Sequence, residues 1–148
     1  MKKVKQILSV FLVITCICLM VGCGSGSGKQ GNKLYGKGES FTLKDIELTP
    51  KCIIEEDDSC KIVFSSDGVD ADNSGDFYME IGEGDDAIEC DSAEAGFQVG
   101  DDGKGDLVLW FTFDDVDSIP DVGTVAYGSI DSNEAVQVDL ASLPRDNE

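Results

Sequence analysis

Cysteine thiols are the strongest potential nucleophiles in this chain, because its 148 residues include six cysteines and no histidine. The lack of histidine removes Ser–His and Cys–His pairs and the commonest general base. Cys52, Cys60 and Cys90 lie among carboxylates, with acids at residues 55–58 between the first two. A reactive thiolate needs a positive neighbourhood. The sequence therefore argues against a cysteine enzyme, while a carboxylate pair of the glycosidase type stays open because no spacing selects one.

The same cysteines have a structural interpretation. If the domain is exported, these three cysteines allow one disulfide and one leftover thiol. Cys52 and Cys60 fit a hairpin in which Ile54 faces Asp58, so that the two cysteines face each other. Facing residues on antiparallel strands are close enough to bridge. We therefore expect a Cys52–Cys60 disulfide, with three buried thiols as the alternative.

One acidic loop has the oxygen spacing of a calcium site. Residues 70–76 run Asp-Ala-Asp-Asn-Ser-Gly-Asp, so oxygen side chains alternate before a glycine that permits a tight turn. This resembles the first half of an EF-hand loop and makes Asp70, Asp72 and Asp76 candidate calcium ligands. The twelfth position is Ile81 instead of a glutamate, so the loop departs from the EF-hand pattern. The alternative is an acidic connecting turn.

The N-terminal region contains a second chemically distinctive cysteine. An apolar run over residues 7–21 follows three lysines and ends at Gly22-Cys23. This run is shorter than the roughly 20 residues that span a bilayer and is typical of a secretory signal. Residues 20–23 (Met-Val-Gly-Cys) resemble the lipobox of bacterial lipoproteins, with Met20 where leucine is usual. The resemblance implies a signal peptide over 1–22, a diacylglyceryl group on Cys23, and a location on the outer face of the cytoplasmic membrane.

The remaining chain divides into a tether and an acidic domain. Glycine, serine and lysine dominate residues 24–38, which predicts a flexible tether after Cys23. Residues 39–148 contain all 30 acids and five basic residues, for a net charge of −25. Such a surface repels nucleic acid and anionic lipid, and it attracts divalent cations and cationic proteins or peptides. The alternative is that this charge serves solubility alone.

Apolar residues alternate with period two over most of residues 39–143, which predicts β-strands. A phase slip between Leu43 and Ile46 indicates a β-bulge or a strand break. Residues 107–113 are apolar on both faces except at Thr112, so they predict a central strand covered on both sides. Its three aromatic residues, Trp110, Phe111 and Phe113, are predicted to be core, and the alternative is an exposed platform for sugars or peptides.

Turn residues separate these short strands, and no stretch of ten residues has a convincing helical period. Seven or eight strands at this spacing predict an all-β fold, a small immunoglobulin-like β-sandwich over residues 39–143, with a tail at 144–148. A small β-barrel is the alternative. Residues 101–106 are predicted to form a hairpin turn.

The layout also resembles the telokin-like, immunoglobulin-type sandwich domains of uncharacterised Gram-positive lipoproteins. The likeness lies in the lipobox, the tether, an opening strand over 39–48, a Tyr127-Gly128 turn and an alternating last strand over 135–140. It implies fold and location only, because that family has no settled activity.

Taken together, these features predict a cell-surface, lipid-anchored module that works by binding or spacing, without catalysis. It would hold the membrane through the lipid on Cys23, would not bind nucleic acid, and would favour a cationic protein or peptide partner. A calcium-dependent binding module is the first alternative, and an enzyme with a carboxylate site is the second. No cofactor other than calcium is expected.

Overall fold

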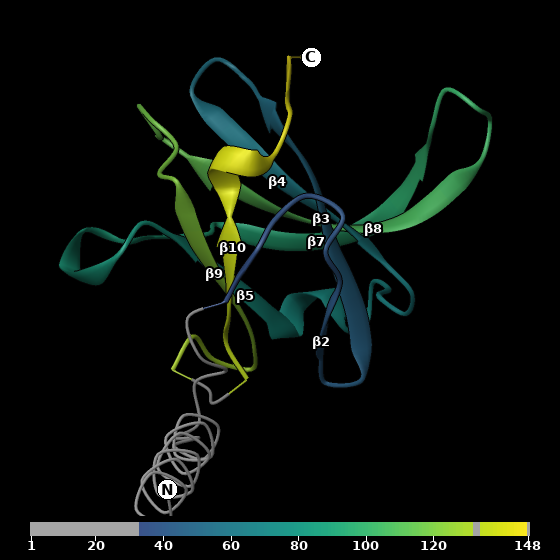
Figure 1. Ribbon diagram of the computed structural model, residues 1–148, viewed down its shortest axis with the longest axis horizontal. Coiled ribbons are helices and arrows are strands. Elements are labelled where there is room, and N and C mark those ends of the chain that lie inside the picture. Colours follow the sequence, from purple (N-terminus) through teal and green to yellow (C-terminus); the bar gives the residue numbers. More distant parts are fainter. Residues whose placement is uncertain (1–32, 132–133, 148) are drawn as a thin grey trace, which may run out of the picture.

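The computed structural model describes residues 33–131 and 134–147, which form two β-sheets packed face to face (Figure 1). The all-β sandwich prediction is therefore confirmed. Seven strands have four or more residues: β3 (Ile46–Glu55), β4 (Ser59–Ser66), β5 (Phe77–Ile81), β7 (Ser92–Val99), β8 (Gly105–Asp114), β9 (Val122–Tyr127) and β10 (Val136–Asp139). Four are shorter: β1 (Leu34–Tyr35), β2 (Phe41–Leu43), β6 (Ile88–Glu89) and β11 (Arg145–Asn147).

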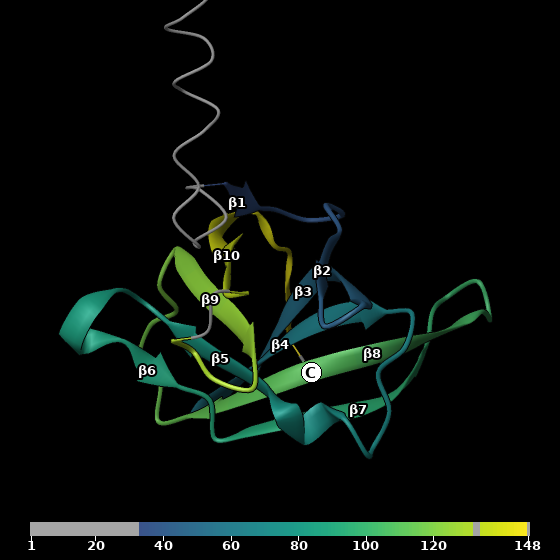
Figure 2. The ribbon, with the colours of Figure 1, turned by 90° about the horizontal axis from the view of Figure 1, so that it is seen from below.

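The sheets contain five and six strands. The five-stranded sheet has the order β1-β10-β9-β5-β6, and the six-stranded sheet has the order β11-β3-β4-β8-β7, with β2 paired to β3 (Figure 2). Strand β1 runs parallel to β10 and β11 runs parallel to β3, whereas the other pairs are antiparallel. The short 3-10 helices η1 (Ser74–Asp76), η2 (Gly84–Asp86) and η3 (Leu140–Ser142) lie between strands. Within the described ranges, no helix has the length and apolar character needed to cross a membrane.

The core lies between the two sheets and follows from the alternation in the sequence. Strand β4 sends Cys60, Ile62 and Phe64 inward, all with at most 2% of their surface exposed. The Phe64 ring meets the Phe111 ring edge to face at 5.7 Å between centroids. Such pairs contribute about 0.5–1.5 kcal/mol beyond the burial of their area.

The phase slip after Leu43 is a hairpin turn. Lys44 and Asp45 have positive φ angles of 49° and 65°, and Leu43 pairs with Ile46 across the turn. Positive φ at both central residues is the signature of a two-residue type I′ turn, whose twist suits antiparallel strands. The strand therefore breaks at this point, and the one register shift in this sheet lies later, between Pro50 and Cys52.

The folded unit is larger than the predicted 39–143. Strand β1 falls in the predicted tether, where the Tyr35 ring packs at 5.2 Å from the Phe41 ring. Strand β11 falls in the predicted tail, where Arg145 forms a 2.8 Å ion pair with Glu55. Both strands are only two or three residues long, which is too short for an alternating pattern in the sequence to predict them. Their extended structure depends on pairing with β10 and β3.

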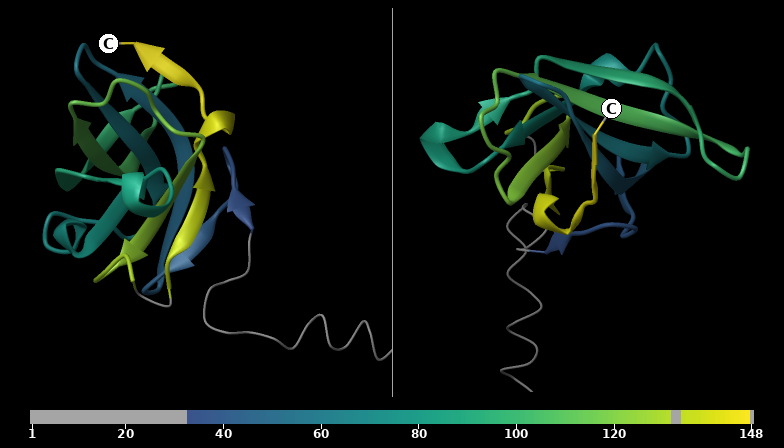
Figure 3. Two further views of the ribbon diagram at one scale, coloured as in Figure 1. Left: turned by 90° about the vertical axis from the view of Figure 1, so that its left-hand side faces the viewer. Right: turned by 90° about the horizontal axis from the view of Figure 1, so that it is seen from above.

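Strand β8 is the long strand predicted over 107–113, but its two faces differ. Phe111 and Phe113 are fully buried in the main core, as predicted. Trp110 faces the other way, where it packs with Val63 and Val108 in a small cluster on the outer surface of the six-stranded sheet. The prediction that Trp110 belongs to the core is wrong, because no further layer covers this outer face among the described residues (Figure 3).

Candidate functional site

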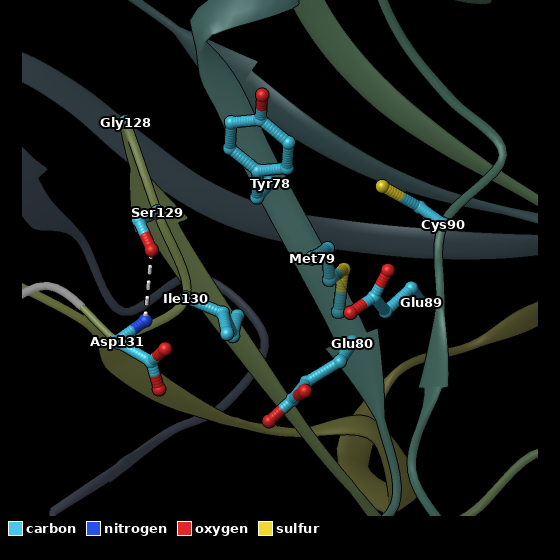
Figure 4. A pocket seen from close by; sticks show the side chains of 9 residues that line it. All are labelled: Tyr78, Met79, Glu80, Glu89, Cys90, Gly128, Ser129, Ile130 and Asp131. Atoms are coloured by element: carbon cyan, nitrogen blue, oxygen red, sulfur yellow. Dashed lines mark hydrogen bonds between the residues drawn. The ribbon is translucent and has the colours of Figure 1, made fainter.

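A groove of about 380 Å³ opens on the five-stranded sheet (Figure 4). Strand β5 contributes residues to it, β6 and the residue after it form one wall, and the segment that follows β9 forms the other. The lining residues are Tyr78, Met79, Glu80, Glu89, Cys90, Gly128, Ser129, Ile130 and Asp131. Because Phe77, Met79 and Ile81 of β5 fill the core, the alternation of the strand sends Tyr78 and Glu80 outward.

Carboxylates dominate the polar side chains of this groove. Glu80 pairs directly with Glu89 across the β5–β6 ladder. Like charges directly opposite each other in a sheet are destabilising. Burial, and then the charges of Glu89 and Asp131, raise the pKa of the Glu80 carboxyl above its usual value. The charges of Glu89 and Asp131 therefore both act on Glu80 within a single site.

No basic group within residues 33–131 and 134–147 forms an ion pair with Glu80, Glu89 or Asp131, since the ion pairs of that region involve other acids. A cationic side chain entering the groove would supply the missing counter-charge. It would also face Tyr78, a residue that is 46% exposed and whose ring attracts cations through its π-face. The geometry thus suits a lysine or arginine side chain.

The Cys90 thiol points into the groove toward Tyr78 (Figure 4). The backbone N–H of Cys90 donates to the Met79 carbonyl at 2.9 Å, which continues the β5–β6 pairing. Burial raises the pKa of this thiol, and the nearby Asp91 and Glu89 charges add to the rise. The thiol is therefore protonated at neutral pH.

The predicted Cys52–Cys60 disulfide is wrong, because Cys52, Cys60 and Cys90 are all free thiols. The β3–β4 ladder pairs Cys52 with Val63 and pairs Cys60 with Glu55. Cys60 lies in the core between the sheets, whereas Cys52 lies in the outer cluster, so the two side chains occupy opposite faces of the sheet. The turn lies further along the chain than predicted, so that Ile54 pairs with Lys61 instead of Asp58, and the bulge after Pro50 does not affect the pairing of Cys52.

Both of these thiols have a raised pKa. Burial raises the pKa of Cys60 to about 11. Burial, followed by the charge of Asp146, raises the pKa of Cys52. Neither thiol is poised for chemistry.

The acidic loop at 70–76 directs its oxygens toward its own backbone. Asp70 Oδ1 accepts the N–H groups of Asp72 and Asn73 at 2.9 and 3.0 Å, and Asn73 Oδ1 accepts the Asp70 N–H at 2.8 Å. The Tyr127 hydroxyl donates to Asp76 Oδ2 at 3.1 Å. In the part of the chain that the structure describes, no three acidic or cysteine side chains are grouped so as to hold a metal ion. The structure does not bring Asp70, Asp72 and Asp76 together, and calcium binding stays a prediction.

A second, more apolar surface lies on the outer face of the six-stranded sheet. A shallow hollow of about 200 Å³ is lined by Ile54, Lys61, Val63, Phe97, Gln98, Val108 and Trp110. The Trp110 Nε1–H donates to Glu94 Oε2 at 3.2 Å. A Cβ atom at Gly96 would lie 2.6 Å from Trp110 Cη2. The lack of a side chain at Gly96 therefore leaves room over β7 for the indole ring of Trp110. Of the proposed aromatic platform, only Trp110 reaches the surface.

The sequence did not single out Glu80, Glu89 or Asp131. They come from β5, β6 and the segment after β9, and only strand pairing brings them together. The available signal was weak: Glu80 occupies the polar position of an alternating strand. Cys23 and the rest of the predicted leader lie outside the described residues.

No protein-family model matches the chain, and searches of the curated proteins and of the solved structures found no match. The assignment of function therefore rests on the geometry and charge of the chain itself.

Proposed function

We propose that the protein is an extracytoplasmic, lipid-anchored binding module without catalytic activity, and that its acidic groove takes a cationic side chain of a protein or peptide partner. One observation supports this most strongly. Glu80 and Glu89 face each other across a strand pair beside Asp131, with no basic counter-charge from the described residues. Such an arrangement costs stability in the free protein, and a bound cation removes that cost.

The charge of the whole domain favours the same class of partner. Residues 39–148 have a net charge of −25. Three of their five basic residues, Lys51, Lys61 and Arg145, already have acidic partners at 3.9 Å or less. A strongly negative surface steers cationic molecules toward it and speeds their association. The groove then provides one place where a cationic side chain is partly desolvated.

The location follows from the N-terminal sequence. The leader and Gly22-Cys23 support lipid attachment, and the tether supports a domain held clear of the membrane. A glycine-rich coil of this length has a reach of roughly 20 Å. Replacing Cys23 with serine should release the protein from the membrane fraction or leave its leader uncut; normal processing and membrane retention of this variant would contradict the anchor.

Several observations favour binding over catalysis. The chain has no histidine. Its three described thiols have raised pKa values. The groove holds carboxylates and a phenol, and these groups suit recognition of a cation.

The groove can be tested with a lysine octapeptide titrated into the full-length chain in neutral detergent. The double variant Glu80→Gln/Glu89→Gln should bind at least about fivefold more weakly than wild type, since two close charges contribute on the order of 1 kcal/mol each in a partly exposed site. Asp57→Asn/Asp58→Asn removes the same charge from the exposed β3–β4 turn and is the matched control. Equal weakening in both variants would show that only the overall charge matters and would refute the groove.

A further inference from the structure

Strand β7 is the one long edge among the described strands. It has eight residues, whereas β1, β6 and β11, which end the sheets elsewhere, have two or three. The β7–β8 hairpin projects beyond the body of the sandwich (Figures 1 and 3). A long edge strand presents unpaired backbone groups and is a template for another strand, so folded proteins usually protect it.

Most of the usual protection is missing from β7. Its sequence, Ser-Ala-Glu-Ala-Gly-Phe-Gln-Val, contains no proline, lysine or arginine, and its only charge is Glu94. The pairing with β8 runs without a bulge from Ser92 to Val99. The strand therefore lacks the lysine, proline and bulge that often prevent the addition of a further strand, and the 3-10 helix η1 lies beside only part of it.

The backbone groups of the projecting end face outward at alternate residues. The Gly100 N–H donates to the Lys104 carbonyl at 2.8 Å, which makes that pair hydrogen-bonded. Because hydrogen-bonded pairs alternate in an antiparallel ladder, Gln98 bonds to β8, whereas Phe97 and Val99 direct their N–H and C=O groups to the free edge. Nothing within residues 33–131 and 134–147 accepts or donates a hydrogen bond there.

The side chains beside this edge differ between the two faces of the sheet. On one face Glu94 lies beside the Trp110 indole, to which it is hydrogen-bonded. On the other face Phe97 and Val99 are 66% and 63% exposed. A basic side chain suits the first face through its charge and the indole ring, and an apolar side chain suits the second.

We propose that the free edge of β7 takes an extended segment of a cationic partner as an added strand, with basic and apolar residues alternating along it. This proposal rests on the proposed function, from which it takes the positive charge of the partner. It adds the way in which the backbone of the partner is held. The acids at the hairpin turn, Asp101 and Asp102, extend the complementarity beyond Glu94. A second copy of this chain is the weaker occupant, because two domains of net −25 repel each other.

The test uses the full-length chain in neutral detergent and a capped octapeptide in which lysine and valine alternate. The control peptide has the same composition, with four lysines followed by four valines. Binding is measured by calorimetry, and hydrogen exchange with mass spectrometry locates it. The alternating peptide should bind at least tenfold more tightly and should slow exchange in residues 92–99. Tenfold corresponds to about 1.4 kcal/mol, which one or two backbone hydrogen bonds supply.

Two variants isolate the backbone contribution. Phe97→Pro removes an outward N–H without losing a bond to β8, and Phe97→Thr removes the same ring but keeps the N–H. The proline variant should bind the alternating peptide about tenfold more weakly than the threonine variant. If Phe97→Pro fails to fold, Val99→Pro against Val99→Thr makes the same comparison at the next outward residue.

Equal binding of the two peptides, or equal binding by the proline and threonine variants, would overturn the added strand. The groove proposal would survive either result if the lysine octapeptide still binds and still depends on Glu80 and Glu89. Protection of residues 92–99 that grows with protein concentration in the absence of peptide would assign the edge to a second copy and would also overturn the proposal.

Discussion

Glu80 and Glu89 oppose each other in the groove, and this arrangement makes stability depend on pH in a predictable direction. The raised pKa of Glu80 means that ionising it costs more in the folded than in the unfolded chain. The cost is present above the folded pKa and disappears as the pH falls through it toward the unfolded value near 4.3.

Glu80→Gln should therefore stabilise the protein at pH 7 by about 0.5 kcal/mol, the scale of one cross-strand like-charge pair. At pH 3.5 it should change stability little. Urea unfolding at the two pH values measures the difference, with Asp57→Asn as the control for net charge. A gain of the same size at both pH values would show that the charge of Glu80 is not its cause.

The three described thiols should resist alkylation in the folded protein. Burial raises the pKa of each, to about 11 for Cys60. Iodoacetamide at pH 8 followed by peptide mass spectrometry should label all three much more slowly in the folded protein than after unfolding. Before unfolding, Cys60 should react most slowly because it is 2% exposed. If Cys52 and Cys60 do not react even after unfolding in the absence of a reductant, they form a disulfide and the free-thiol account is wrong.

At the scale of elements, the outer and inner residues of β8 should differ in their effect on stability. Phe111→Ala should cost about 3–5 kcal/mol, as for a large aromatic residue removed from a core. Trp110→Ala should cost about 2 kcal/mol, because its ring is only partly buried. Chemical unfolding measures both, and acrylamide should quench Trp110 in the folded state. A blue-shifted emission that acrylamide does not quench would instead place Trp110 in the interior.

The comparison of sequence and structure is clearest for the strands. Alternation predicted β4, β5 and β10, because a residue at every second position must face the core, and a continuous apolar run predicted β8. It did not predict pairing. The partner of Cys52 depends on the position of the β3–β4 turn, and the meeting of Glu80 with Glu89 depends on which strand lies beside β5. The sequence did not predict strand β7, because alanine occupies its inward positions 93 and 95 and gives only a weak alternation of apolar residues.

Trp110 shows a second limit of the sequence pattern. Continuous apolar character over 107–113 is typical of a strand buried on both faces. Here the outer residues Val108 and Trp110 pack with Cys52 and Val63 in one small cluster. These side chains bury part of one another's surface without a further layer of structure over the sheet. A strand of this kind cannot be told from a doubly buried one without knowledge of its neighbours.

At the scale of the whole molecule, the charge of residues 39–148 should make stability depend on salt. Self-repulsion opposes the compact state, and salt screens it. Calcium chloride and sodium chloride at matched ionic strength should raise the melting temperature equally, since Asp70 is already occupied by its own loop. A larger shift with calcium that is lost in Asp70→Asn/Asp72→Asn would establish the calcium loop instead.

The same excess of acids raises the question of whether a cationic partner meets one site or the whole surface. Thirty acids lie in residues 39–148, and most of them are exposed loop carboxylates with no particular arrangement. In the groove, three of them line one cavity without a basic counter-charge from the described residues. A partner held there would touch few of the acids that attract it.

The most direct test is a zero-length cross-linking map. The lysine octapeptide is bound to the full-length chain in neutral detergent, and a carbodiimide joins lysine Nζ to any carboxylate in contact. Peptide mass spectrometry then identifies the linked acids. The proposed binding site predicts that Glu80, Glu89 and Asp131 dominate the map and that excess sodium chloride abolishes these links. Links spread over the acids in proportion to their exposure, with no excess at these three, would contradict a cation-binding groove.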